Sequence, residues 1–98
     1  MLQITFIRWP AVVARTGLPI STISDQAKDG TFVTPVPIAR RATGFPEHEI
    51  DALCAARLAG QSDDEIRLLV QWLESQRPKF WAELAPEIFP AEEEPAAA

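Results

Sequence analysis

The chain has 98 residues, of which 47% are hydrophobic, enough for one small domain with a modest core. The formal charge of −5 argues against nucleic acid only at first sight, because residues 1–60 carry six basic against five acidic side chains and residues 61–98 carry three against nine. There is no apolar run of about 18 residues, no signal-peptide pattern and only one cysteine, so we expect a cytoplasmic protein without a membrane span or an internal disulfide.

The first two elements expected along the chain are a strand and a helix. Residues 3–7, QITFI, alternate polar and apolar side chains, which predicts a short strand. Residues 8–17, RWPAVVARTG, predict a helix, because Pro10 suits a first turn and Gly17 suits the position after the last turn.

A second helix is expected directly after this glycine, in residues 19–30. Pro19 fits its first position, and Gly30 is placed to end it. Ile23 and Ala27 lie four residues apart and are expected to face the core. The outer side then carries Ser21, Thr22, Asp25, Gln26 and Lys28 or Asp29. Two helices joined by so short a break predict a helix-turn-helix.

Residues 31–45 cannot continue the helix, because Pro35 and Pro37 lack the backbone N–H that a helix needs. The β-branched residues around them predict two short extended arms joined near residues 39–41. This pattern is typical of a wing, a hairpin beside a helix-turn-helix. Arg40 and Arg41 are then expected at its tip.

Two further helices are expected in the rest of the chain. The first begins near Pro46, has acids in its first turn, and places one stripe on the core: Ile50, Leu53, Cys54, Arg57 and Leu58. The second begins at Ser62, which forms a Ser-x-x-Glu capping box with Glu65. Its stripe comprises Ile66, Leu69, Val70 and Leu73. Pro78 is expected to end or kink this helix, with one or two further turns after it.

These elements divide the chain into three parts. Residues 1–60 are expected to form a winged helix-turn-helix domain, and residues 61–85 a helical extension that completes the core or carries a dimer contact. Residues 86–98 are rich in proline, acid and alanine, which predicts a disordered tail. The expected fold class is mainly α, with a short two-stranded wing and an added C-terminal helix.

This order of elements resembles the AlpA family of phage transcriptional regulators and the related excisionases, which share a MerR-like winged-helix fold. The segments VVARTGLPISTI, KDGTFVTPV and RRATGFPEHEIDAL carry the resemblance, and ARLAGQSDDEIRLLV fits the longer members. The resemblance implies sequence-specific binding to short double-stranded DNA sites, with the second helix in the major groove and the wing on the backbone or minor groove.

The chain departs from the family pattern within the second helix. Members usually have Ser-Arg-Ser-Thr-hydrophobic-Tyr-Arg there, whereas this chain has Ile20 and Asp25 in place of the two arginines and Ser24 in place of the tyrosine. Because basic side chains supply many phosphate contacts, most of the positive charge has to come from elsewhere, including Arg8 or Arg15. The expected DNA-binding set is Ile20, Ser21, Thr22, Asp25, Gln26, Lys28, Arg40 and Arg41.

Other interpretations of the same residues stay open. Ser21 and Thr22 could satisfy free backbone donors of the first turn, and the two wing arginines could stand on a solvated hairpin tip. The domain could also be a protein-interaction module that has lost DNA affinity, with Ile20 and Asp25 forming a mixed apolar and acidic face. Whether a DNA-binding protein of this kind activates, represses or excises is not encoded in the residues.

Partner contacts are expected on the C-terminal extension, because two of the three tryptophans lie on a segment too short to form its own core. The expected set, used in a homodimer or in self-association on DNA, is Leu69, Trp72, Leu73, Phe80 and Trp81. His48 has no second ligand at a useful spacing, and Cys54 lies on an apolar stripe. No metal site, cofactor, catalytic residue or small-molecule substrate is therefore expected, and an enzyme is the most distant interpretation.

Overall fold

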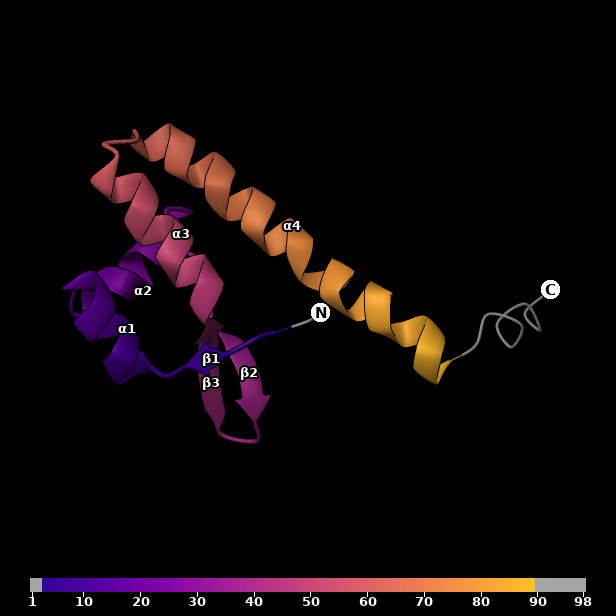
Figure 1. Ribbon diagram of the computed structural model, residues 1–98. Helices are drawn as coiled ribbons and strands as arrows, with labels where there is room; N and C mark the ends of the chain where they lie inside the picture. The colour runs from indigo at the N-terminus through magenta and orange to yellow at the C-terminus, as the bar shows by residue number, and fades with distance from the viewer. Residues whose placement is uncertain (1–2, 90–98) are drawn as a thin grey trace.

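The computed structural model describes residues 3–89, which form four helices and a small antiparallel sheet at one edge (Figure 1). The sheet has the strand order β1-β3-β2, with β1 (Phe6–Ile7) and β2 (Val36–Ala39) on either side of β3 (Ala42–Pro46). The expected mainly helical winged fold with an added C-terminal helix is confirmed. The short strand expected in residues 3–7 is confirmed as well, and it adds a third strand to the wing.

The helix-turn-helix consists of α1 (Trp9–Thr16) and α2 (Ile20–Asp29), as expected. Gly17 has a φ of 74° and donates its N–H to the Val13 carbonyl at 2.8 Å, which closes α1. Gly30 closes α2 in the same left-handed conformation, with a φ of 90°. Only glycine adopts this conformation without steric cost, so these two residues fix where each helix ends.

The wing is the hairpin of β2 and β3, and its two-residue turn is Arg40-Arg41, as predicted. A close approach between strands explains the glycine at position 44. A Cβ there would lie 3.1 Å from the Ile38 side chain and 3.3 Å from the Ile7 carbonyl oxygen. A bare backbone at Gly44 therefore lets β1 and β2 both pack against β3.

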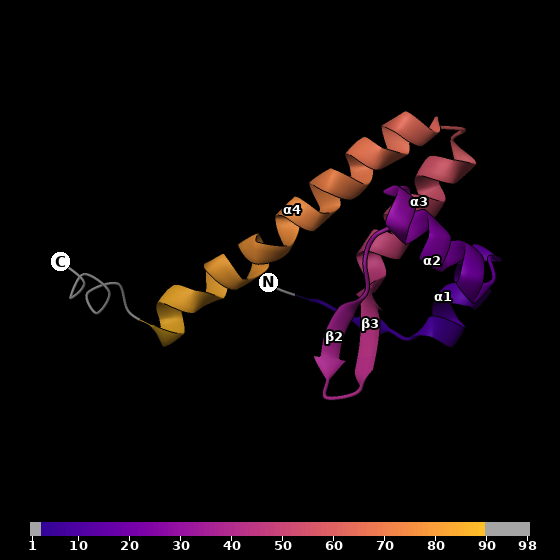
Figure 2. The same ribbon diagram turned by 180° about the vertical axis from the view of Figure 1, so that it is seen from behind.

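Two longer helices complete the core, α3 (Glu47–Leu58) and α4 (Asp63–Ile88). Figures 1 and 2 show α4 along one side of the molecule, with α3 packed against it and the other elements beyond. Ile23, which was expected to face inward, is fully buried, and Ala27 packs against the core. The buried apolar residues are Val12, Ile23, Phe32, Val33, Phe45, Ile50, Leu53, Ile66, Val70 and Leu73.

The stripe predicted for α3 is correct only in its first half. Ile50 and Leu53 are buried, but Leu58 is 90% exposed, and Arg57 is exposed and paired with Asp63 instead of buried in the core. The chain turns at Gly60 immediately after this helix, and Leu58 in its last turn is left uncovered. Among the described residues, no helix is long and apolar enough to cross a bilayer.

Of the two outcomes predicted at Pro78, an end or a kink of the helix, the end is wrong, because α4 continues through Pro78 and Pro86 to Ile88. Proline removes one backbone donor and crowds the preceding turn, which disfavours a helix interior. Here the contacts of Arg77 and Phe80 with the rest of the domain hold the helix on both sides of Pro78. The predicted tail therefore begins too early at residue 86, and its residues 90–98 lie outside the described part of the chain.

Candidate nucleic-acid interface

The turn between α1 and α2 holds the second helix by short backbone and hydroxyl contacts. Thr16 donates its hydroxyl to the Val12 carbonyl at 2.8 Å and accepts the Leu18 N–H at 3.2 Å. Pro19 stands just before α2 and provides no side-chain cap. The backbone donors of the first turn of α2 are therefore not capped by the residue that precedes it.

The expected reading residues of α2 do not all lie on one face. Ser21, Asp25 and Lys28 are exposed and follow the i, i+4, i+7 spacing of one outer face. Ile20, at the start of the helix, is 53% exposed. Ser24 also lies on this side, so it belongs with the outer residues although the sequence comparison counted it only as a lost tyrosine.

Thr22 and Gln26 lie away from this outer face and are half-buried. Gln26 lines a hollow of about 520 Å³ together with Leu53, Cys54 and Arg57 of α3. Its placement on the same face as Ser21 and Asp25, which the sequence interpretation assumed, is therefore wrong. Residues three or four positions apart share a face of a helix, whereas Ser21 and Gln26 are five positions apart and therefore do not.

The alternative that Ser21 and Thr22 serve as internal caps finds no support in the geometry. Within residues 3–89, neither hydroxyl has a hydrogen-bond partner, and α2 has no side-chain cap. Both hydroxyls are therefore free to bind a ligand.

The wing tip is held close to the start of α1. Trp9 donates its indole N–H to the Thr43 hydroxyl at 3.2 Å, and its ring packs edge-on against Phe45 with 5.0 Å between the centroids. This contact joins β3 to α1, so it holds the wing in a fixed position relative to the helix-turn-helix. Arg40 and Arg41 at its tip are exposed.

Ion pairing divides the basic side chains into two groups. Arg15 contacts Glu47 and, at 3.4 Å, Asp51 of α3, so this arginine, expected as a further source of positive charge for DNA, is occupied within the chain. The other basic residues with an acidic partner are Arg57, Arg67 and Arg77. In the part of the chain that the structure describes, five have no carboxylate at ion-pair distance: Arg8, Lys28, Arg40, Arg41 and Lys79.

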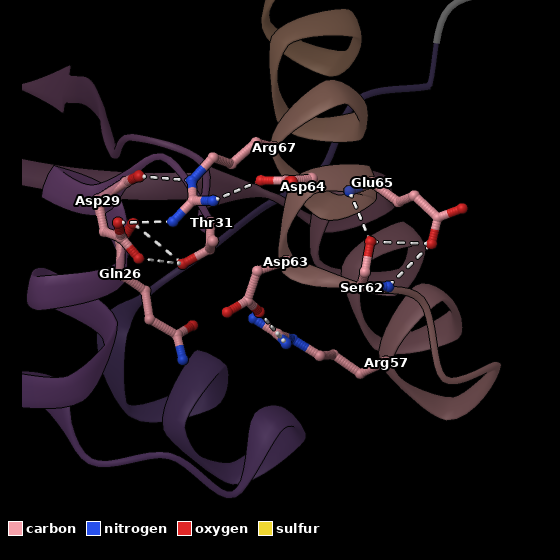
Figure 3. A network of polar contacts seen from close by, with 9 residues as sticks. All are labelled: Gln26, Asp29, Thr31, Arg57, Ser62, Asp63, Asp64, Glu65 and Arg67. Atoms are coloured by element: carbon pink, nitrogen blue, oxygen red, sulfur yellow. Dashed lines mark hydrogen bonds and ion pairs between the residues drawn. The ribbon is translucent and has the colours of Figure 1, made fainter.

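The end of α2 is fastened to α4 by Arg67. Its guanidinium donates to the Asp29 carbonyl at 3.1 Å and to the Asp29 carboxylate at 2.9 Å, and a further bond reaches Asp64 (Figure 3). Hydrogen bonding to Asp29 raises the pKa of Arg67 above its ordinary value. The aliphatic part of Arg67 also lies 3.7 Å from where a Cβ of Gly30 would be.

A second set of contacts fastens the segment between α2 and the wing. The Glu74 carboxylate accepts the backbone N–H of Thr34 at 2.8 Å, and Arg77 donates to the Thr34 carbonyl at 2.9 Å. Arg77 also forms an ion pair with Glu49 at 2.6 Å, and the Glu49 side chain has no exposed area. This hydrogen bond raises the pKa of Arg77, so the guanidinium stays charged.

The sequence interpretation missed the contacts made by Arg67 and by Arg77, and it treated Glu49 only as an acid of the first turn. A signal was present, since Glu49 stands four residues before Leu53 and therefore on the buried face of its helix. A carboxylate in that position requires a buried partner. The sequence gives no indication that the partner is Arg77, which is 28 residues away.

The residues expected to contact a partner also fall into two groups. Leu73 is 4% exposed and Leu69 packs against the same core, so Leu73 as a partner contact is wrong. It points inward because the stripe of α4 closes over α3. Trp72 and Trp81 are 58% and 52% exposed, and Phe80 is half-buried against the ring of His48.

His48 and Cys54 lie in unremarkable surroundings. His48 is exposed beside Phe80, with 5.5 Å between the ring centroids, and Cys54 is a half-buried free thiol. Across residues 3–89, no three histidine, cysteine or acidic side chains are grouped so that they could hold a metal ion.

Comparison with known proteins gives one match. The family model described as prophage CP4-57 regulatory protein (AlpA) matches residues 5–58, which span β1 to the end of α3. The match leaves out α4, and with it Arg67, Glu74 and Arg77. No curated protein and no solved structure gives a significant match.

Proposed function

We propose, on the premise that the chain belongs to the AlpA family of prophage regulatory proteins, that it regulates by binding double-stranded DNA in a sequence-specific manner. In this proposal α2 enters the major groove, and the wing contacts the backbone or minor groove. The protein acts by occupying or bending its site and carries out no chemistry. It performs one of the tasks of such regulators, activation, repression or excision.

The observation that carries the proposal is the division of the basic side chains. Four of those without an acidic partner in residues 3–89 lie just before α1, in α2 and at the tip of the wing: Arg8, Lys28, Arg40 and Arg41. Basic groups that stabilise the fold are paired, whereas these four remain available for phosphate oxygens. This supports DNA binding despite the net charge of −5, because the excess acid belongs to residues 61–98.

The composition of α2 supports a form of DNA recognition that uses few basic side chains. The uncapped backbone N–H groups at its start can hold a phosphate. Ser21 and Ser24 offer hydroxyls to base edges, and Ile20 is exposed enough to touch a thymine methyl group. Asp25 can accept a hydrogen bond from the N4 amino group of cytosine. Thr22 and Gln26 contribute contacts to the bases only if α2 is tilted in the major groove.

The test starts with duplex DNA selected from a random pool by the protein itself, and measures affinity as a function of salt concentration. Replacing both wing arginines, Arg40→Ala with Arg41→Ala, removes two phosphate contacts. The slope of log affinity against log salt is then expected to become shallower by about 2. The matched control is Lys79→Ala, which also removes an unpaired cation but from α4 and therefore leaves the slope unchanged.

A second candidate function has one observation in its favour. Ile20 is 53% exposed beside Asp25, a combination that suits a protein partner better than a phosphate backbone. If no DNA sequence is enriched and no binding occurs at low salt, the DNA-binding proposal is wrong. The protein-interaction module on a winged scaffold is then the better proposal.

A further inference from the structure

Helix α2 is anchored in the core by few of its own side chains. Ile23 is the one residue of α2 that is buried, and Ala27 adds only a methyl group beside it. Gly30 then connects α2 to Thr31, which is buried again. Because glycine permits many backbone angles, this connection does not by itself fix the direction of the helix.

The second half of α2 is the part that such freedom affects most. From Ile23 to Asp29 the helix advances about 9 Å, so a small tilt about Ile23 displaces the end at Asp29. Asp25 and Lys28 of the exposed outer face lie in this half. Their position relative to a bound DNA molecule therefore depends on what holds the end of α2.

Arg67 of α4 binds this end of α2 at two points. Its Nε donates to the Asp29 carbonyl at 3.1 Å, and one of its Nη atoms donates to the Asp29 carboxylate at 2.9 Å (Figure 3). The carbonyls at the end of a helix have no partner within the helix, so the first bond satisfies a free acceptor. Asp64 accepts a bond from the other Nη at 3.0 Å. Two bonds from a planar guanidinium fix a direction as well as a distance.

Glu74 of the same helix binds the chain where it enters the wing. Its carboxylate accepts the Thr34 N–H at 2.8 Å and the Thr34 hydroxyl at 3.1 Å. Phe32 and Val33 anchor the preceding residues in the core, whereas Thr34 is exposed and lies two residues before β2. Glu74 therefore holds the backbone at the point where the wing leaves the core.

The two contacts come from one face of one helix. Arg67 and Glu74 are seven residues apart, which is two turns of α4 and about 10 Å along its axis. Ile66, Val70 and Leu73 of the same turns are buried in the core, so this part of α4 is itself firmly held. The match to the AlpA family model ends at residue 58, and both contacts lie outside it.

We propose that Arg67 and Glu74 are positioning residues of the DNA-binding surface, which fix the end of α2 and the start of the wing relative to each other. The proposal rests on the function proposed above, because the surface concerned is the one assigned to DNA. Phosphate contacts give affinity for any sequence, whereas base contacts require α2 to lie at a defined angle in the groove. Both residues therefore act on the discrimination between sequences.

The exposure of these contacts separates positioning from fold stability. The side chains of Arg67 and Asp29 are 37% and 52% exposed, and that of Asp64 is 93% exposed. Ion pairs in such surroundings contribute little to the free energy of unfolding. Loss of Arg67 is therefore expected to loosen the end of α2 and to leave the rest of the fold intact.

The first experiment follows amide hydrogen exchange by NMR on the full chain without DNA. The N–H groups of Gly30 and Thr31 close α2 onto the Gln26 carbonyl. Arg67→Ala should speed their exchange by about tenfold, whereas the N–H of Val70 in the core should exchange at the wild-type rate. Unchanged exchange at Gly30 and Thr31 overturns the proposal.

The matched control for this experiment is Arg57→Ala. Arg57 is a similarly exposed arginine, 44% against 37% for Arg67, and its partner Asp63 also lies in the first turn of α4. Its ion pair does not involve α2, so its loss should leave the exchange at the end of α2 unchanged. Equal acceleration by both variants would assign the effect to loss of charge and would overturn the role of Arg67.

The second experiment compares affinity for the selected duplex with affinity for a duplex of unrelated sequence. Arg67→Ala should lower the ratio of the two affinities by about tenfold, the value of one base contact, and leave the salt slope on the unrelated duplex unchanged. A phosphate contact of Arg67 would instead weaken both affinities and make the slope shallower by about 1, which would overturn the proposal. Arg67→Lys keeps the charge without the planar pair of bonds, so it should restore the ratio only in part.

A matched pair of variants tests Glu74 in the same titration. Glu74→Gln and Glu74→Ala remove the same charge, but glutamine keeps an oxygen that can accept the Thr34 N–H. Glu74→Gln should therefore keep the wild-type ratio of affinities, and Glu74→Ala should lower it. An equal loss in both variants would overturn positioning by Glu74.

The two experiments separate failure of this proposal from failure of the proposed function. If wild type binds no DNA of any sequence, the proposed function is wrong, and hydrogen exchange alone decides whether α4 holds the end of α2. If wild type selects a sequence but Arg67→Ala discriminates equally well, DNA binding stands and the positioning role is overturned. Urea unfolding of each variant completes the test, because a large loss of unfolding free energy would assign Arg67 to fold stability instead.

Discussion

Helices α2 and α4 both carry charged residues, yet they use them in different ways. The first turn of α4 is closed by a full capping box, and both of its arginines are bound by carboxylates. The first turn of α2 has no side-chain cap, and its Lys28 has no acidic partner among the described residues. Satisfied groups hold the fold together, whereas unsatisfied groups on an exposed helix are available to a ligand. Predictions about α4 therefore concern the free energy of unfolding, and predictions about α2 concern DNA affinity.

The largest expected effect concerns α4, whose arginines are both paired with carboxylates. Arg77→Ala leaves the carboxylate of Glu49 buried without a partner and also frees the Thr34 carbonyl. Breaking a buried pair on one side costs about 3 kcal/mol of unfolding free energy, which urea denaturation measures. Arg40→Ala with Arg41→Ala should change the unfolding free energy by less than about 0.5 kcal/mol, because both residues are exposed and unpaired.

The double variant Glu49→Leu with Arg77→Met separates charge from packing. It removes both charges and keeps most of the volume, so it should be clearly more stable than Arg77→Ala alone. If the two are equally unstable, the cost of Arg77→Ala does not come from an uncompensated Glu49, and the comparison between the helices loses its physical basis.

The next largest effect concerns the exposed outer face of α2. Asp25→Arg replaces a carboxylate that repels phosphate by a group that binds it, at an exposed position of α2. Affinity for duplex DNA of unselected sequence, in which Asp25 makes no cytosine contact, should rise by roughly tenfold, the equivalent of one charge-assisted hydrogen bond, and the salt slope should steepen by about 1. The measurement is the same salt titration, and Glu83→Arg provides the control in which affinity stays constant, because Glu83 is exposed on α4 and has no ion-pair partner among the described residues. Unchanged affinity with Asp25→Arg would remove α2 from the interface.

The smallest effect concerns the cap of α4 and depends on pH. Glu65 accepts the backbone N–H of Ser62 at 2.9 Å, and this hydrogen bond lowers the pKa of Glu65 below 4.5. The contribution of the carboxylate to stability is therefore present above pH 4.5 and is lost as the pH falls through the lower pKa of the folded state. Wild type should exceed Glu65→Gln in unfolding free energy at pH 7, and the difference should shrink below pH 4.5.

Removing the hydroxyl of the same cap gives a reference value. Ser62→Ala should cost about 1 kcal/mol at pH 7, since it leaves the N–H of Glu65 without its acceptor. The corresponding change in α2, Ser21→Ala, should leave stability unchanged because Ser21 makes no hydrogen bond within the described residues. If Ser21→Ala destabilises the chain by as much, Ser21 is a structural cap, and the contrast between the two helices fails.

The order of elements could be predicted from local signals. Gly17 and Gly30 ended the expected helices at the residues where the structure ends them, and the prolines at positions 35 and 37 placed the wing. Capping, turn and breaker signals act over a few residues, so they can be seen in the chain itself. Pro78 does not end α4, which was one of the two outcomes predicted there, because contacts from distant residues outweighed the local preference of proline.

The candidate site could be predicted only in part. Arg40 and Arg41 were identified correctly as an exposed tip, since a hairpin turn is local. The different fates of Arg15 and Arg8 could not be foreseen, because one meets Glu47 and Asp51 of α3 and the other meets no acid within residues 3–89. Which charges are free depends on which helices are packed together.

The sequence by itself determined the helix-turn-helix, the wing and the capped start of α4, because glycine, proline and capping residues act on their own backbone neighbours. Only the tertiary structure decided that Arg67 fastens Asp29 and that Arg77 neutralises the buried Glu49. It also decided that the last turns of α4 project beyond the other elements and leave Trp81 and Ile88 exposed. Those outcomes depend on distances between residues far apart in the chain, which no local pattern records.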